Sequence, residues 1–98
     1  MKLLRFAPDF CCYPIWHDDS RITEEFGDID PRSLPISLGL VNDLMAWSDW
    51  FDKGFVGFGV EGLVWEEGEK DQFIVSGLQL LNRLRQELGS EFVVRRGF

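Results

Sequence analysis

The sequence has very few of the side chains that usually carry chemistry: two cysteines and one histidine among 98 residues. All three lie between Cys11 and His17. A structural zinc site needs four ligands and usually spaces its cysteines two to four residues apart, whereas Cys11 and Cys12 are adjacent and have no second pair. A redox pair normally has two residues between its cysteines. We therefore expect no metal, no cofactor and no redox site, with one thiol buried as a small hydrophobic group and the other half exposed.

Long apolar runs and nucleotide-binding motifs are also missing. No run approaches the roughly 20 apolar residues that a membrane span needs. The first ten residues are too short for the apolar core of a signal peptide and contain no cleavage site, so we expect one cytoplasmic domain over residues 1–98. The segment Gly57–Gly62 matches GxGxxG, but no complete βαβ unit surrounds it. We therefore do not expect nucleotide binding.

His17 is the remaining candidate for catalysis. No Gly-x-Ser-x-Gly nucleophile motif accompanies it, and the adjacent Asp18 and Asp19 are too close in sequence to converge on its ring easily. The acidic run that follows lacks the register of an EF-hand calcium loop. We interpret His17 as a surface loop residue and expect that the protein is not an enzyme.

Acidic charge is what the sequence has in excess. The net charge is −7, and residues 1–71 hold 15 acidic against 6 basic side chains, whereas residues 72–98 hold 2 against 4. Such a surface repels nucleic acid and membrane headgroups and attracts basic proteins. Much of the charge falls in a polar loop between His17 and Pro31. This loop is either a solvated charge run or a contact for a cationic partner.

The apolar periodicity predicts an α+β fold in the order β-β-α-(β or loop)-α-β. Strands are expected at residues 2–6, 10–16 and 90–97, with Pro14 placing the second strand at an edge or breaking it. One helix should begin after the N-cap Ser37 and end near Gly54, and another should end at Gly89. The result is a small sheet of three or four strands packed against two amphipathic helices on one face. The terminal strands should share the sheet. The glycine-rich segment 54–62 is open to interpretation as a loop, a bulged strand or a hairpin.

Tryptophan is abundant for so short a chain, with four residues. Core packing accounts well for Trp47 on the first predicted helix, but less well for Trp50 and Trp65. Tryptophan is enriched in the energetic centres of interfaces, so these two side chains are candidates for partner contact. The alternative is that they are partly covered core aromatics.

A pattern in the first half of the chain resembles a family of small acidic bacterial proteins. The pattern runs Cys-aromatic-Pro-x-Trp, then Ile-Asp-Pro-x-x-Leu-Pro-Leu-Ser, then a helix with Leu-x-x-Trp that ends in aromatic-Asp. The residues that carry it here are Cys12, Tyr13, Pro14, Trp16, Ile29, Asp30, Pro31, Leu34, Pro35, Ser37, Leu44, Trp47, Phe51 and Asp52. After Asp52 the family usually has Thr-x-Asn and Asp-Pro followed by Ser-Gly-Phe, whereas this chain reads KGFVGFGVEG.

Members of that family resemble immunity proteins of bacterial toxin systems, including contact-dependent growth inhibition. The resemblance implies a cytoplasmic protein that binds one cognate toxin domain, for which a nuclease with a basic active-site cleft is expected, and blocks it. The residues expected to contact the toxin are Asp18, Asp19, Glu24, Glu25, Asp28, Asp30, Trp50, Phe55, Phe58 and Trp65. Two alternatives stay open: an acidic adaptor or nucleic-acid mimic with several basic partners, and a small enzyme that uses His17.

Overall fold

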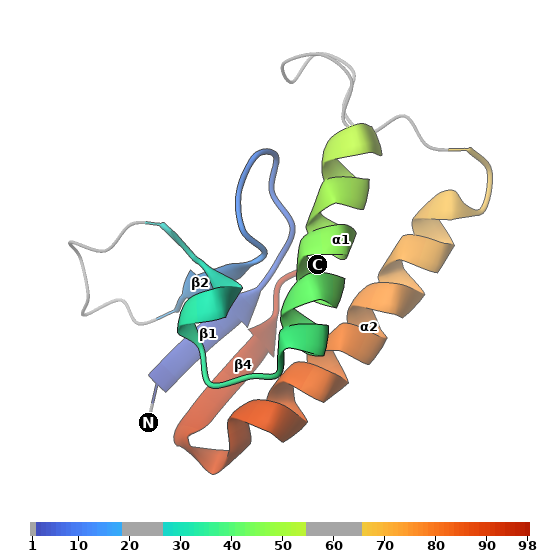
Figure 1. The fold of residues 1–98 in the computed structure, drawn as a ribbon. Coiled ribbons are helices and arrows are strands. Elements are labelled where there is room, and N and C mark those ends of the chain that lie inside the picture. The colour runs from blue at the N-terminus through green and yellow to red at the C-terminus, as the bar shows by residue number, and fades with distance from the viewer. Residues whose placement is uncertain (1, 19–26, 55–65) are drawn as a thin grey trace.

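A computed structural model describes residues 2–18, 27–54 and 66–98 of the chain. Within this part, a four-stranded mixed sheet packs against two long helices, which lie side by side over one face of the sheet (Figure 1). The strands are β1 (Lys2–Phe6), β2 (Ile15–His17), β3 (Asp28–Ile29) and β4 (Phe92–Arg96). Their order in the sheet is β3-β2-β1-β4. The predicted α+β fold with helices and a small sheet is therefore confirmed.

The two terminal strands share the sheet, as predicted, and the structure shows that they are neighbours in it. β1 and β4 run parallel, with Leu4 opposite Val94, while β1–β2 and β2–β3 are antiparallel. Alternate residues of β1 point to opposite faces, so Leu4 and Phe6 are buried while Leu3 is 36% exposed. Together with Ile15 of β2, the inward side chains form the sheet's half of the hydrophobic core.

Helix α1 (Leu38–Gly54) begins at the predicted N-cap. The Ser37 hydroxyl accepts the Leu40 N–H at 3.2 Å, which satisfies one of the unpaired donors of the first turn. The Glu87 carboxylate of the second helix accepts both the N–H and the hydroxyl of Ser37, at 2.6 and 3.0 Å. Because Glu87 lies 50 residues away in sequence, this contact also fixes the two helices to each other.

Helix α2 (Glu69–Leu88) ends at Gly89, as predicted. The backbone of Gly89 has a φ of 75°, which glycine adopts readily at the end of a helix. Its apolar stripe packs on α1 around Trp47, which stacks on Phe73 with ring centroids 4.2 Å apart. The indole N–H of Trp47 also donates to the Phe73 carbonyl at 3.0 Å. Opposite this ring stands Gly77, where an added Cβ would lie 2.7 Å from Trp47. The close approach of the two helices therefore depends on the absence of a side chain at this position.

Two details of the sheet differ from the prediction. The second strand begins at Ile15 instead of Phe10, because Asp9–Cys12 forms a turn closed by the Cys12 N–H and the Asp9 carbonyl at 3.2 Å. The strand is therefore broken at Pro14, and β2 is an inner strand of the sheet. The second difference is β3, a two-residue strand inside the stretch predicted as a loop. Of the glycine-rich segment, all but Gly54 lies outside the described residues.

No helix in the described ranges is both long enough and apolar enough to cross a membrane.

Candidate interaction surface

The exposed side of α1 is a narrow ridge that stands between two hollows. Asn42, Ala46, Asp49 and Lys53 are all exposed, and their spacing of three and four residues places them on one helical face. On one side of this α1 ridge lies a cleft with an acidic lining, and on the other lies a groove between α1 and α2. The helix therefore presents a convex strip with a concave site on each side.

The acidic cleft has a volume of 300 Å³ and lies between α1 and the turn before β2. Asp28, Asp49 and Asp52 bring three carboxylates to its wall, two of them from α1 and the third from β3. Asp49 is exposed, whereas Asp28 and Asp52 are half-buried. Carboxylates in a partly enclosed site act on a cation more strongly than the same groups in open water, because the surrounding protein lowers the local dielectric.

Side chains of α1 hold the turn that closes this cleft. The Cys11 N–H donates to the Asp52 carboxylate at 3.0 Å, and the Ser48 hydroxyl donates to the Cys12 carbonyl at 2.9 Å. The Tyr13 N–H donates to the Asp28 carboxylate. Cys11 has φ of 59°, a conformation that only glycine adopts without cost, so these contacts hold a turn that is otherwise unfavourable. Cys12, Tyr13 and Asp52 belong to the pattern noted in the sequence, and in the fold they build this junction.

The adjacent cysteines are both free thiols. Cys11 is exposed and Cys12 is half-buried, where one buried and one half-exposed thiol had been predicted. Burial, followed by the negative charges of Asp28 and Asp9, raises the pKa of Cys12. A raised pKa leaves little thiolate at neutral pH, which is the opposite of what a nucleophilic cysteine requires. Among the described residues, no three His, Cys, Asp or Glu side chains are grouped so that they could hold a metal ion.

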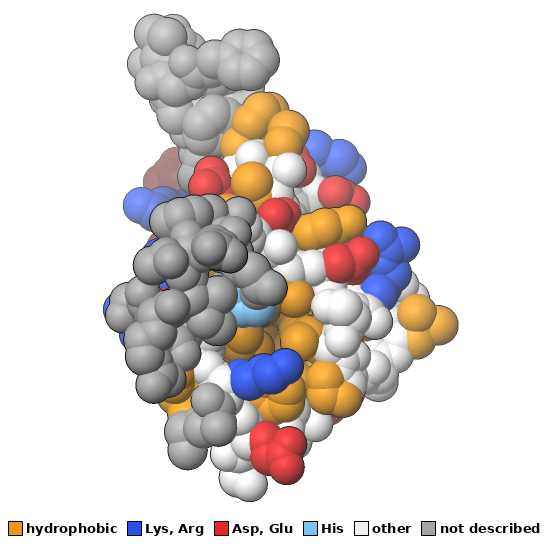
Figure 2. Space-filling model, turned by 90° about the vertical axis from the view of Figure 1, so that its left-hand side faces the viewer, with side chains coloured by type: hydrophobic (Ala, Val, Ile, Leu, Met, Phe, Trp, Pro, Cys, Tyr) orange, Lys and Arg blue, Asp and Glu red, His pale blue; other side chains and the backbone are white. Residues whose placement is uncertain are grey.

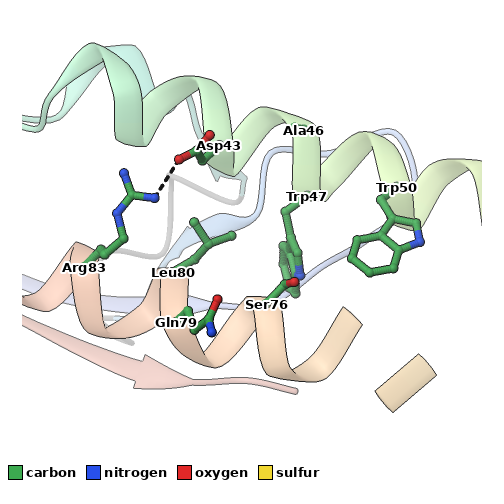
Figure 3. A pocket seen from close by; sticks show the side chains of 8 residues that line it. All are labelled: Asp43, Ala46, Trp47, Trp50, Ser76, Gln79, Leu80 and Arg83. Atoms are coloured by element: carbon green, nitrogen blue, oxygen red, sulfur yellow. Dashed lines mark hydrogen bonds and ion pairs between the residues drawn. The ribbon is translucent and has the colours of Figure 1, made fainter. Parts of the chain in front are cut away.

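The groove between the helices has a volume of 320 Å³ and an apolar floor (Figure 3). Trp47 and Leu80, both buried members of the core, form this floor. The side chains around them are Ala46, Trp50, Ser76 and Gln79. At one end, an ion pair between Asp43 and Arg83 links the helices at 2.6 Å, with the two side chains 56% and 43% exposed.

Trp50 stands at the other end of this groove. Its indole N–H donates to the Glu69 carboxylate at 3.1 Å, and its ring meets Phe73 edge-on at 5.2 Å. The side chain is half-buried, so part of the indole lies at the surface while the rest packs on the core. This position agrees with both sequence interpretations of Trp50, as a covered aromatic and as a contact residue.

The predicted contact residues of the polar loop that the structure describes all take part in internal interactions. Asp18 forms a bidentate pair with Arg95, both bonds at 2.8 Å, and Asp28 accepts the Tyr13 N–H. Asp30 caps the short 3₁₀ helix η1 (Pro31–Ser33), and hydrogen bonds from Arg32 lower its pKa. The other predicted contact residues, Asp19, Glu24, Glu25, Phe55, Phe58 and Trp65, lie outside the described residues.

His17, the alternative catalytic residue, is the exposed last residue of β2. Acidic and basic side chains of the described part adjoin one another on the side of the molecule that Figure 2 shows. The two hollows beside α1 do not include His17. Its position at a strand end agrees with the interpretation as a surface residue.

The charges are distributed unequally between the two layers. The helical layer, residues 38–54 and 66–88, has eight acidic and four basic side chains, a net charge of −4. The sheet layer, residues 2–18, 27–37 and 89–98, has five of each and is neutral. The predicted contact residues lie in the polar loop and among the aromatics Trp50, Phe55, Phe58 and Trp65, and they do not include Asp49 of the cleft or Ala46 of the groove. The spacing of exposed residues on α1 was the available signal for the ridge, but which acids line a cleft depends on tertiary packing.

Comparison with known families gives one match that covers nearly the whole chain. The model of a family described as Serratia CdiI immunity protein-like matches residues 2–95. No curated protein matches the sequence.

Proposed function

Since the chain belongs to the Serratia CdiI immunity protein-like family, and so is an immunity protein against a contact-dependent growth inhibition toxin, we propose that it covers a basic, nuclease-type active-site cleft of that toxin. Nuclease clefts are cationic because they bind phosphates. An acidic protein with a narrow exposed helix can enter such a cleft and exclude the substrate. The mechanism is occlusion, and this chain makes or breaks no covalent bond.

The observation that carries this proposal is the α1 ridge with the acidic cleft beside it. The ridge is convex, while the cleft gathers Asp28, Asp49 and Asp52 around 300 Å³ of accessible space. A lysine or arginine at the rim of the toxin's active site would be drawn into the cleft, because complementary charge accelerates and orients association. The internal hydrogen bonds of Asp28 and Asp52 do not remove their negative charge, so both carboxylates still contribute to this attraction.

Electrostatic steering also involves the acidic residues between His17 and Pro31. In the proposal, Asp18, Asp28 and Asp30, together with Asp19, Glu24 and Glu25, attract the toxin from a distance, while the surface around α1 and Trp50 makes the close contact. An inhibitor that must act before damage spreads has to bind tightly, and we expect nanomolar affinity or better, about −12 kcal/mol. Long-range attraction of this kind weakens as salt screens the charges.

The test is a pair of charge reversals that are equal in charge but different in place. Asp49→Lys changes the exposed acid between the ridge and the cleft, and Glu91→Lys makes the same change in the 3₁₀ helix η2 (Gly89–Glu91) of the sheet layer. Association with the cognate toxin domain is measured by surface plasmon resonance at low salt. We expect Asp49→Lys to slow association by about fivefold or more and Glu91→Lys to change it much less.

Two results would count against the proposal, and they have different meanings. If the unchanged protein neither binds the toxin domain nor protects cells that express it, the inhibitory function itself is wrong. If it binds and both reversals slow association equally, the immunity function stands but the contact is not centred on α1. Reversal of Asp19, Glu24 and Glu25 together tests the contribution of the loop in the same assay.

A further inference from the structure

The groove between α1 and α2 is lined by the kinds of side chains that form the centre of a protein interface. Its floor is formed by the buried side chains of Trp47 and Leu80, which are 3% and 6% exposed. Trp50 and Ala46 continue this apolar surface outward on the side of α1. Interface centres are apolar, rich in tryptophan and surrounded by polar side chains. Gln79, Ser76 and the Asp43–Arg83 pair provide such a polar surround here.

We propose that this groove receives one large apolar side chain of the toxin, and that this side chain lies next to a lysine or arginine in the toxin. The proposal rests on the immunity function above and names the contact that anchors it. The volume of 320 Å³ is at the small end of the range for ligand pockets, which suits a single side chain better than a cofactor or substrate. An anchor of this kind supplies the apolar binding energy that charge attraction alone does not give.

The basic neighbour of the anchor follows from the charge around the groove. The helical layer carries a net charge of −4, with Asp43 at one end of the groove and Glu69 at the other. The Asp43–Arg83 pair is solvent-exposed on both sides. Exposed pairs of this kind stabilise proteins little, so Asp43 can exchange Arg83 for a cation of the toxin at small cost. An acidic partner segment would be repelled by the same surface.

Filling the groove from α2 tests the proposal without altering the α1 ridge. In Gln79→Trp, an exposed residue of the groove wall becomes large enough to occupy the space, and Ser76→Leu fills it from the neighbouring turn. The control is Asn82→Trp, an exposed position on the same helix that does not line the groove. Circular dichroism melting of all three variants establishes that the fold is retained.

The readout is the dissociation rate of the complex with the cognate toxin domain. We expect Gln79→Trp and Ser76→Leu to speed dissociation by at least tenfold while the association rate at low salt stays within twofold. Asn82→Trp should dissociate like the unchanged protein. If the groove-filling variants are folded and dissociate like the parent, the groove is not the anchor site, although the immunity function still stands. If the parent does not bind the toxin domain at all, it is the immunity function that fails.

A double-mutant cycle identifies the anchor itself. Each apolar toxin residue that adjoins a lysine or arginine is replaced by alanine and measured against the parent and against Gln79→Trp. The anchor is the residue whose replacement weakens binding to the parent at least tenfold but has little further effect on Gln79→Trp, because residues in contact are not additive. If every such residue is additive with Gln79→Trp, no toxin side chain occupies the groove and the proposal is overturned.

Discussion

The two layers of the molecule use their charges differently. In the sheet layer, five acidic and five basic side chains balance, and some of them form ion pairs within the fold. Asp18 pairs with Arg95, which lies 77 positions away in sequence. Asp30 pairs with Arg32 at the short helix η1 that precedes α1. The helical layer has eight acidic side chains and four basic ones. Of the acids, Asp49 and Asp52 line the cleft, and Asp43 lies at one end of the groove.

This difference indicates a division of labour between the layers. Exposed ion pairs contribute little free energy, so the paired charges of the sheet layer mainly specify which segments adjoin. Unbalanced charge in the helical layer repels itself and therefore costs some stability, a cost that binding to a cationic partner removes. In the proposal above, the sheet supports the helices, and the helices present the surface that meets the partner.

The largest effect is expected from a substitution that changes the packing of the helical layer and not its exposed surface. Gly77→Ala places a Cβ 2.7 Å from the Trp47 side chain and 2.9 Å from that of Phe98, so these aromatic rings or the backbone that carries them must shift. We expect the free energy of unfolding to fall by about 1–3 kcal/mol, the usual cost of overpacking a core. Urea denaturation followed by circular dichroism measures this change.

The matched control is Gly39→Ala on the exposed side of α1, where an added Cβ meets nothing within 4 Å. There the substitution should raise the free energy of unfolding by about 0.5 kcal/mol, because alanine is the better helix former. Equal effects of the two substitutions would show that the close approach at Gly77 does not matter.

A smaller effect is expected when the charge pairing of the sheet layer is broken. Asp18→Asn removes the charge that Arg95 meets in two hydrogen bonds of 2.8 Å. We expect a loss of about 0.5–1 kcal/mol in the free energy of unfolding, with a smaller effect on toxin association than Asp49→Lys has. A larger kinetic effect than that of Asp49→Lys, measured in the same resonance assay, would move the centre of the contact from the helical layer to the sheet layer.

Much of the fold was predictable because its apolar periodicity is strong. The apolar residues at helical spacing from Leu40 to Phe51 predicted the first helix. Ser37 correctly predicted where that helix begins, and Gly89 where the second helix ends. The second strand was predicted too long, because aromatic content alone does not reveal that Asp52 and Ser48 of α1 fix Cys11 and Cys12 in a turn. The short β3 was not predicted, because two residues are too few to show an alternating apolar pattern. They form a strand only by pairing with β2.

The site was less predictable, because the sequence does not show which acids stand free and which are used inside the fold. The run of carboxylates after His17 looks like one unit in sequence, yet Asp18, Asp28 and Asp30 have three different internal partners. Asp28 instead meets Asp49 and Asp52 in one cleft. Trp50 was predicted as a contact candidate from composition. The groove that it borders depends on how α1 and α2 lie relative to each other, which the sequence does not show.

The most direct test of the account is to map the toxin contact on the folded protein. Backbone amide signals of the isotope-labelled chain are recorded by NMR before and after addition of the unlabelled cognate toxin domain. We predict the largest changes at the exposed α1 residues Asn42, Ala46 and Asp49 and at Ser76 and Gln79 across the groove, with small changes along β4. Changes concentrated on β1 and β4, with α1 unaffected, would contradict the claim that the helical layer is the surface that binds the toxin.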